Sequence, residues 1–494
     1  MQPFSHTATL PRPVVILTVV AIGLFAAQLL LGTELYFAAG VLAALLIVVF
    51  TCQCIGFATV GGVLIAAFAV RYLVFAQVVK TAYGQPGHTN LAAPETTIAV
   101  ILVGTISMCL AALVVSRVLG ERTIIRFQTS PDTLAWVRDF SFVIGIAVVL
   151  TSRAGGDGQF GGALGIAKQL TNLGYFAIMV ETFRVLTLTG GKRSLSPYLI
   201  GMIAIFTLLG FSQNSKTGIA LPYFAYLLAA IGHRGAMSRR QIVATVIGGM
   251  LFAGLIYPMV HILRALTERV GISAEFGLAF ELLSDALAGP DFFNDLWSMM
   301  DSAPDESVYA QGLNYLGARD HLVGRFLLIA NTDTIVNAVN ADGIYGPALI
   351  RAGLDSAKPH FISPDKLQGS TGDVVTWYYG LRTWGEVGYP ANGLLADCYA
   401  ALGWLGVAVL PFCLHAALLT LLQLPGRRAG GNLVGIFLVL INIQPFCEAN
   451  IQQTVTSILR GMPQYIVAIV GLFLLVDFIG ARRGRAARAA APGA

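Results

Sequence analysis

The chain has 494 residues, of which 56% are hydrophobic and 12% are charged, and its formal net charge is +5 at pH 7. Soluble domains carry about 25% charged residues, so this composition excludes an ordinary soluble protein, and the small net charge is not that of a nucleic-acid-binding one. The dense runs of Leu, Val, Ile and Ala lack the alternation of an outer-membrane β-barrel. We therefore expect an all-α polytopic membrane protein.

Twelve apolar segments are candidates to cross a bilayer as helices, which takes roughly 20 residues each. We expect them at residues 13–31, 36–54, 57–79, 96–116, 137–152, 163–186, 197–212, 217–232, 241–263, 393–422, 432–447 and 463–480. The fifth, seventh and eleventh are shorter than the others. The tenth contains Gly403 and Gly406, which predict a bend within it or a re-entrant piece before it.

Basic residues alternate between the two sides of these segments. With the first residue on the cytoplasmic side, most Lys and Arg residues fall in inner segments, and the tail after Gly480 is also basic. The positive-inside rule then predicts that both termini are cytoplasmic and that the long loop lies on the other face, periplasmic or extracellular. We expect nine membrane helices in residues 1–263, a large periplasmic loop in 264–392, three membrane helices in 393–480 and a basic cytoplasmic tail in 481–494.

The large loop is polar, aromatic and rich in arginine. Residues 274–287 and 322–339 have amphipathic helical patterns. The outer arginines are Arg264, Arg269, Arg319, Arg325, Arg351 and Arg382. Arginine presents a planar fork of donors that fits phosphate oxygens, so the cluster suits a diphosphate whose lipid tail stays in the membrane. The alternative is that individual arginines form weak surface salt bridges with acidic residues of the loop.

Further candidate binding groups are predicted to lie on the same outer side. They are Arg153, Lys216, His360, Glu448 and Arg460. Arg153 opens a glycine-rich loop that matches no P-loop pattern and is better explained as a flexible hairpin. His360 is a lone loop histidine, and such residues are more often simply solvated. Arg71 lies in the middle of the third segment, and charges inside membrane segments are rare and tend to be functional.

Residues 376–406 carry the densest local pattern. Trp377, Tyr378, Tyr379, Trp384 and Tyr389 flank Arg382 and Glu386. Aromatic rings at this place indicate either sugar contacts or a membrane-interface belt. Glu386 follows Arg382 by four residues, a spacing that pairs them if the segment is helical. Glu386 could instead deprotonate a sugar hydroxyl, with Asp373 and Asp397 as alternative bases.

The six cysteines lie in or beside apolar runs without metal-ligand spacing. Buried thiols are the expected reading, and no disulfide framework is indicated. We therefore expect no metal site and no cofactor.

These residues together resemble the bacterial oligosaccharide repeat-unit polymerases of the O-antigen polymerase (Wzy-like) type. The resemblance covers the plan of about twelve spans with a late periplasmic loop and three short motifs. The motifs are Ser212–Gly218, Gly385-Glu386 with Tyr399 and Gly403–Gly406, and Glu448 with Asn450 and Arg460. Lys216 stands where the family more often has an arginine, which leaves the role of that position open.

The resemblance implies an all-helical glycosyltransferase of the C type that joins repeat units carried on undecaprenyl diphosphate. The catalytic residues would be Glu386, Arg382, Arg319 and Arg325. The substrate-binding residues would be Arg264, Arg351, Lys216, Arg153, His360, Trp384, Tyr379, Glu448 and Arg460. Membrane lipids and a chain-length regulator protein would be its further partners, with no nucleic acid and no nucleotide sugar.

Three alternatives remain open at this point. An O-antigen ligase-like transferase would move a finished glycan and would produce no ladder of chain lengths. A polysaccharide or lipid transporter often has inverted repeats and short loops, whereas this sequence shows no repeat and has one long loop at 264–392. A scaffold subunit of an export complex would use the loop as an interaction surface with replaceable arginines.

Overall fold

The computed structural model describes most of the chain. It leaves undescribed residues 1–11, 121–123, 126, 128–129, 155–169, 213–214, 235–237, 257–258, 261–276, 278–283, 285–313, 318–326, 359–361, 364–368, 386–387, 389, 391, 427, 430–431 and 491–494. For residues 12–13, 152–154, 212, 234, 253, 255 and 481–490 it describes the backbone alone.

The described part of the chain is all-helical, without a β-strand. Among the described residues, six helical stretches are long and apolar enough to cross a membrane: Leu35–Ile55, Val60–Ala82, Pro94–Leu119, Pro131–Thr151, Leu394–Gln423 and Ile451–Gly480. Shorter apolar helices occupy Val14–Leu30, Pro197–Phe211 and Leu433–Glu448. The protein is thus a polytopic helical membrane protein. Each of the twelve expected segments overlaps a helix, whereas twelve crossings and their orientation stay a prediction.

The chain folds as two compact units, and the first comprises Met1–Arg122, Asp305–Gln423 and Asn442–Leu459. Its N-terminal helices are α1 (Arg12–Leu30), α2 (Leu35–Ile55), α3 (Val60–Ala69), the π-helical turn η1 (Val70–Val74), α4 (Phe75–Ala82) and α5 (Pro94–Leu119). The later ones are α17 (Leu328–Asp342), α18 (Ala348–Ala357), α19 (Thr371–Tyr378), α20 (Leu394–Gln423) and α22 (Ile451–Thr456).

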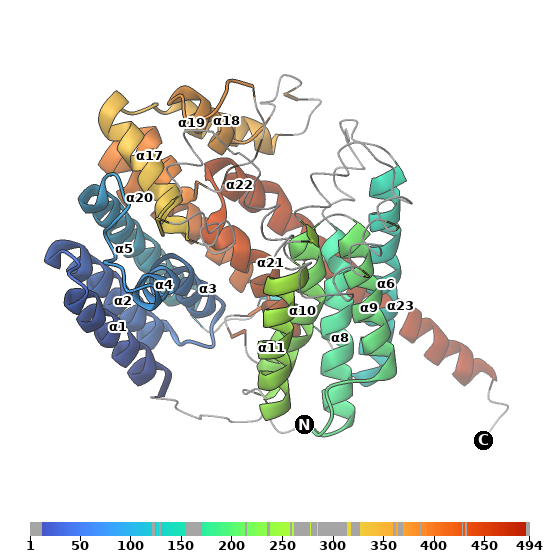
Figure 1. Cartoon of the computed structure of the whole chain (residues 1–494). Helices are drawn as coiled ribbons and strands as arrows, with labels where there is room; N and C mark the ends of the chain where they lie inside the picture. The colour runs from blue at the N-terminus through green and yellow to red at the C-terminus, as the bar shows by residue number, and fades with distance from the viewer. Residues whose placement is uncertain are drawn as a thin grey trace. The chain divides into compact units, whose positions relative to one another are not determined.

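Helix α5 is the centre of packing in unit 1. It contacts α2 on one side and α20 on another, and α17 packs on both α5 and α20 (Figure 1). Small residues permit close approach of the helices: a Cβ added at Gly104 of α5 would meet the side chain of Leu395 of α20. A Cβ at Gly40 of α2 would likewise meet Ile98 of α5. These contacts fix the frame that carries the polar residues of unit 1.

The second unit comprises Thr123–Pro304, Leu424–Ile441 and Arg460–Ala494. Its helices are α6 (Pro131–Ala154), α8 (Leu173–Leu188), α9 (Pro197–Ser212), α10 (Lys216–Arg234), α11 (Arg239–Leu251), the π-helical turn η3 (Phe252–Ile256) and α23 (Met462–Ala490). Helix α21 (Leu433–Glu448) continues from unit 2 into unit 1, and the π-helical turn η4 (Ser457–Gly461) also spans the division. Glu181 of α8 accepts hydrogen bonds from Arg138 of α6 at 2.7 Å and from Ser196 at 3.0 Å, which joins elements within this unit.

The expected bend in the tenth segment is confirmed. Helix α20 has non-helical backbone angles at Leu402 and at Gly403, where φ is 59°. Glycine adopts a positive φ without the steric cost that other residues meet, so Gly403 accounts for the break. The break separates a short half, in which every residue from 394 to 401 is buried, from a longer half that continues to Gln423.

The large loop contains more helix than its sequence pattern predicts. The expected helix at 322–339 is confirmed from Leu328 onward and extends to Asp342 as α17; residues 322–326 lie outside the described part. Most of the expected helix at 274–287 also lies outside it. Helices α18 and α19 were not expected, and each follows a turn or cap within the loop.

Candidate functional site

Unit 1 encloses a group of polar side chains where α19, α20 and α22 meet, and all of them are buried except the half-buried Gln452. We call Thr371, Asp373, Asn392, Asp397 and Gln452 the polar layer. Asp397 is fully buried, and its Oδ2 accepts a hydrogen bond from the Thr371 hydroxyl at 2.9 Å. The Gln452 side chain accepts from the Thr371 backbone N–H at 2.7 Å, and the Asn392 amide donates to the Gly372 carbonyl at 3.1 Å.

The first residues of two helices donate hydrogen bonds to the Asp397 carboxylate: Thr371 of α19 through its hydroxyl and Ile451 of α22 through its backbone N–H. Ser370 caps α19 and Asn450 caps α22, each through a capping box. The backbone N–H of Ile451, the first residue of α22, donates to Asp397 Oδ2 at 3.2 Å. Helix N-termini carry partial positive charge and stabilise anions, so this arrangement offsets part of the cost of burying a carboxylate.

Asp373 connects the start of α19 to Arg382. Its carboxylate is fully buried and accepts hydrogen bonds from the Ser370 N–H at 2.8 Å and from the Gly388 N–H at 2.9 Å. The Arg382 Nη1 lies 3.7 Å from Asp373 Oδ1, and the arginine side chain is 15% exposed. A Cβ added at Gly388 would collide with the Arg382 guanidinium. Asp373 therefore acts as a cap and as the anchor of Arg382.

The helical pairing of Arg382 with Glu386 is not supported. Helix α19 ends at Tyr378, and residues 379–385 form turns and bends in which Gly380 and Gly385 have positive φ. The four-residue spacing argument needs a helix, so it does not apply here. Arg382 lies 3.7 Å from Asp373, and because Glu386 lies outside the described residues, its pairing with Arg382 stays a prediction.

A second arginine–carboxylate pair joins Arg71 in η1 to Glu448 at the end of α21. The two side chains are 29% and 18% exposed, and the Gln444 amide donates to Glu448 Oε2 at 2.9 Å. Single π-helical turns inside helices are frequent at functional sites. An ionic pair within helices of this apolar character is itself a functional indicator.

The Arg71 pair adjoins the polar layer through Gly393. Tyr72, the neighbour of Arg71, is fully buried, and its hydroxyl accepts from Thr332 of α17 at 3.4 Å. A Cβ added at Gly393 would collide with the Tyr72 hydroxyl, and the Gly393 carbonyl accepts from the Asp397 N–H at 3.3 Å. Arginines, carboxylates and hydroxyl groups thus form one continuous group in unit 1.

Aromatic side chains beside this group divide into buried and exposed ones. Tyr379 is buried, and its hydroxyl donates to the carbonyl of Gly343 at the end of α17, at 2.8 Å. Burial raises the pKa of Tyr379 well above its ordinary value. Trp384 is 77% exposed and lies 5.6 Å from Trp377 between ring centroids. Tyr379 is therefore a structural tyrosine in this state, whereas Trp384 presents its ring outward.

The remaining predicted residues are on α18, in unit 2 or outside the described residues. Arg351 is on α18, 87% exposed, with its Nε 3.8 Å from Asp355. Lys216 begins α10, Arg153 lies near the end of α6, and Arg460 lies in η4, and these three belong to unit 2. Glu386, Arg319, Arg325, Arg264 and His360 lie outside the described residues.

Several members of the polar layer were missed as site residues from the sequence. Thr371, Asn392 and Gln452 are ordinary polar residues in a single sequence, and their convergence depends on tertiary packing. One local signal was present: Ser370 precedes Asp373 by three residues, a spacing that resembles a capping box. It would have located the start of α19 and hence Thr371.

Among the residues that the structure describes, no group of three or more His, Cys, Asp or Glu side chains is placed to hold a metal ion. No protein-family model, curated protein or solved structure matches this chain. Function is therefore inferred from the side chains of unit 1 and their chemistry.

Proposed function

We propose that the protein is a Wzy-like glycosyltransferase that polymerises undecaprenyl-diphosphate-linked oligosaccharide repeat units on the periplasmic face of the bacterial inner membrane. The proposal includes the twelve-span topology with cytoplasmic termini. One observation supports it most: two arginines, Arg71 and Arg382, each stand beside a carboxylate next to a buried polar layer, among apolar helices.

A transferase with a lipid diphosphate donor needs cations that are oriented before the substrate arrives. Glu448 and Asp373 would hold the two guanidinium groups in place. In the proposed reaction the bond between the anomeric carbon and the diphosphate oxygen breaks, and undecaprenyl diphosphate leaves with the electron pair. The arginines would stabilise the negative charge that develops on the leaving group.

The acceptor in this reaction is a sugar hydroxyl of the next lipid-linked repeat unit. Its oxygen forms the new glycosidic bond, and its proton passes to a carboxylate. Glu386, four residues after Arg382 in the sequence, is the proposed base. The exposed ring of Trp384 offers a face on which sugar C–H groups could stack.

A transporter is the second candidate, and the break in α20 favours it. Helix α20 is interrupted at Leu402 and Gly403, and its buried half carries Asp397 beside the N-terminus of α22. Transporters bind substrates and ions at discontinuous helices of this kind. A transporter would move lipid-linked units across a vesicle membrane without changing their length, whereas a polymerase would lengthen them.

The test compares three variants of the Arg71 pair: Arg71→Gln, Glu448→Gln and the double replacement. Each single change leaves one charge without its counterpart. Breaking a fully buried pair costs about 3–5 kcal/mol. Because these side chains are 29% and 18% exposed, we expect a smaller loss of unfolding free energy, about 1–3 kcal/mol. The double variant should recover most of that loss.

Activity is then measured on the purified full-length protein with lipid-linked repeat units, as the length distribution of the product. We expect the double variant to be stable and inactive, because the phosphate-binding cation is gone. Arg240→Gln, an exposed change in unit 2, is the control and should lengthen product normally. Normal product from the stable double variant would mean that the pair is only structural and would contradict this role of Arg71.

A further inference from the structure

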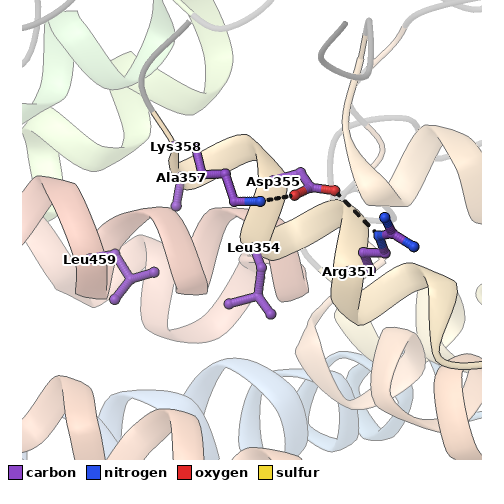
Figure 2. A pocket seen from close by; sticks show the side chains of 6 residues that line it. All are labelled: Arg351, Leu354, Asp355, Ala357, Lys358 and Leu459. Carbon is purple, nitrogen blue, oxygen red and sulfur yellow. Dashed lines mark hydrogen bonds and ion pairs between the residues drawn. The ribbon is translucent and has the colours of Figure 1, made fainter. Parts of the chain in front are cut away.

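A groove between α18 and η4 shares no lining residue with the polar layer or with either arginine–carboxylate pair. It has a volume of about 410 Å³. Its walls are Arg351, Leu354, Asp355, Ala357, Lys358 and Leu459. Figure 2 shows Lys358 and Arg351 directed at Asp355 from either side along α18, with Leu354 and Leu459 below them. All six residues belong to unit 1.

The polar side of the groove carries two cations and one carboxylate. Lys358 Nζ donates a hydrogen bond to Asp355 Oδ1, and Arg351 Nε lies 3.8 Å from Asp355 Oδ2. The hydrogen bond from Lys358 holds the pKa of Asp355 below its ordinary value, with further help from the charges of Lys358 and Arg351. Asp355 is therefore ionised at neutral pH, and the groove has a net charge of +1 from its three ionised residues.

The apolar side of the groove is formed by two exposed leucines. Leu459 is 57% exposed and belongs to the stretch Ile451–Gly480, which is long and apolar enough to cross a membrane. Leu354 of α18 is 46% exposed, whereas Leu349 and Gly353 of the same helix are buried. A Cβ added at Gly353 would lie 3.1 Å from the Ile451 side chain of α22. Helix α18 thus packs on α22 and leaves Arg351 and Leu354 on its outer faces, as interfacial amphipathic helices do.

We propose that this groove binds the headgroup of an anionic phospholipid such as phosphatidylglycerol. The phosphodiester would lie between Arg351 and Lys358, and the first methylene groups of an acyl chain would lie on Leu354 and Leu459. A phosphodiester carries a single negative charge and matches the net +1 of the groove. A diphosphate carries more charge than these residues balance.

The site needs little rearrangement to accept its ligand. Exposed ion pairs such as those of Asp355 contribute only about 0–1 kcal/mol, so both cations can turn from the carboxylate to a phosphate. Arginine and lysine bind phosphate oxygens through charge-assisted hydrogen bonds. The groove would therefore tether α18, and with it the C-terminal side of the large loop, to the outer membrane surface.

The test is native mass spectrometry of the full-length protein in detergent, with phosphatidylglycerol and phosphatidylcholine supplied at equal concentration. Each basic residue near a membrane surface contributes about 1 kcal/mol to binding anionic lipid, which is roughly fivefold in affinity. We expect wild type to retain phosphatidylglycerol preferentially. The double change Arg351→Gln with Lys358→Gln should weaken that retention by roughly 20- to 30-fold.

The change Asp355→Asn tests the opposite direction, because it raises the net charge of the groove to +2. Retention of phosphatidylglycerol should then increase by about fivefold. If the three side chains were only structural, retention of phosphatidylglycerol would not fall in the Arg351→Gln, Lys358→Gln variant and rise in the Asp355→Asn variant. Lys192→Gln with Arg193→Gln, an exposed pair in unit 2, is the control and should leave retention at this site unchanged.

Four results would overturn the proposal. They are equal retention of the two lipids by wild type, equal loss in the control, displacement of the lipid by millimolar sodium phosphate, and preference of the groove for undecaprenyl diphosphate over phosphatidylglycerol. The third would identify a site for free phosphate, and the last would assign the groove to the substrate. Thermal unfolding of every variant checks that the protein remains folded, as expected for changes at positions 87% and 50% exposed.

Discussion

Arg382 is held by its surroundings rather than by a regular element. It follows the end of α19, contacts the buried Asp373, and occupies the space that Gly388 leaves open. Asp373 in turn is fixed by donors from Ser370 and Gly388. The position of the guanidinium thus depends on the absence of a single methyl group at residue 388.

This dependence predicts the effect of Gly388→Ala. The new methyl group would displace the Arg382 guanidinium, which can move cheaply because it is the end of a flexible side chain. We therefore expect a stability loss below about 1.5 kcal/mol together with loss of glycan product, because Arg382 is a proposed catalytic residue. Product length with lipid-linked substrate measures the activity, and thermal unfolding measures the stability.

Gly201→Ala is the matched control, because a Cβ there meets nothing within 4 Å. It should retain normal product. If Gly388→Ala also makes normal product, the observed placement of Arg382 has no part in the reaction.

At the scale of residues, the sequence identifies candidate charged residues of the site but not which residue each of them contacts. Arg71 and Glu448 are each conspicuous as charges in or beside apolar segments, and Asp373 and Asp397 are recognisable as possible bases. Arg71 and Glu448 are 377 positions apart in the chain, and nothing local in a single sequence links them. The pairing of Arg382 with Glu386 was inferred from spacing, and a non-helical backbone removes its basis.

At the scale of elements, α17 is joined to α5 by one carboxylate. Asp333 of α17 is 2% exposed and accepts hydrogen bonds from the N–H groups of Ala92 and Ala93 at 2.6 and 3.0 Å, and from the Thr97 hydroxyl at 2.8 Å. It thereby caps α5 from another element. Burial raises the pKa of Asp333, and these hydrogen bonds oppose the shift only in part.

The raised pKa predicts a pH dependence of stability. Between the ordinary value of about 3.9 and the raised folded value, the folded state binds more protons at Asp333 than the unfolded state. The contribution of Asp333 to stability therefore decreases as pH rises through this window. Thermal unfolding of the full-length protein in detergent should show wild type losing stability relative to Asp333→Asn as the pH is raised. A relative gain for wild type would contradict this account of the contact.

Hydropathy and glycine placement predict much of the helical organisation. All twelve expected segments overlap helices, and the bend in α20 occurs at Gly403 as expected. Helices α18 and α19 escaped prediction because they have only 10 and 8 residues. Such short helices depend on packing and caps, since isolated helices of that length are marginal. Gly353 against Ile451 and the capping box of Ser370 supply these supports.

At the scale of the molecule, the sequence predicts the class of protein, a polytopic helical membrane protein, but only part of the candidate site. A content of 56% hydrophobic and 12% charged residues predicts membrane-spanning helices. Both units contain helices that are long and apolar enough to cross a membrane. The polar layer of unit 1 assembles from segments near residues 371, 392, 397 and 452, which only tertiary packing brings together.

The most direct test of the proposed polymerase is deletion of the gene in its native host, with the surface glycans separated on a gel. Complementation uses wild type, Glu386→Gln and the Gly201→Ala control. We expect single-repeat glycans in the deletion strain and ladders restored by wild type and by the control but not by Glu386→Gln. Unchanged ladders in the deletion strain would contradict the polymerase, and lipid-linked polymer that is never attached to its acceptor would indicate a ligase.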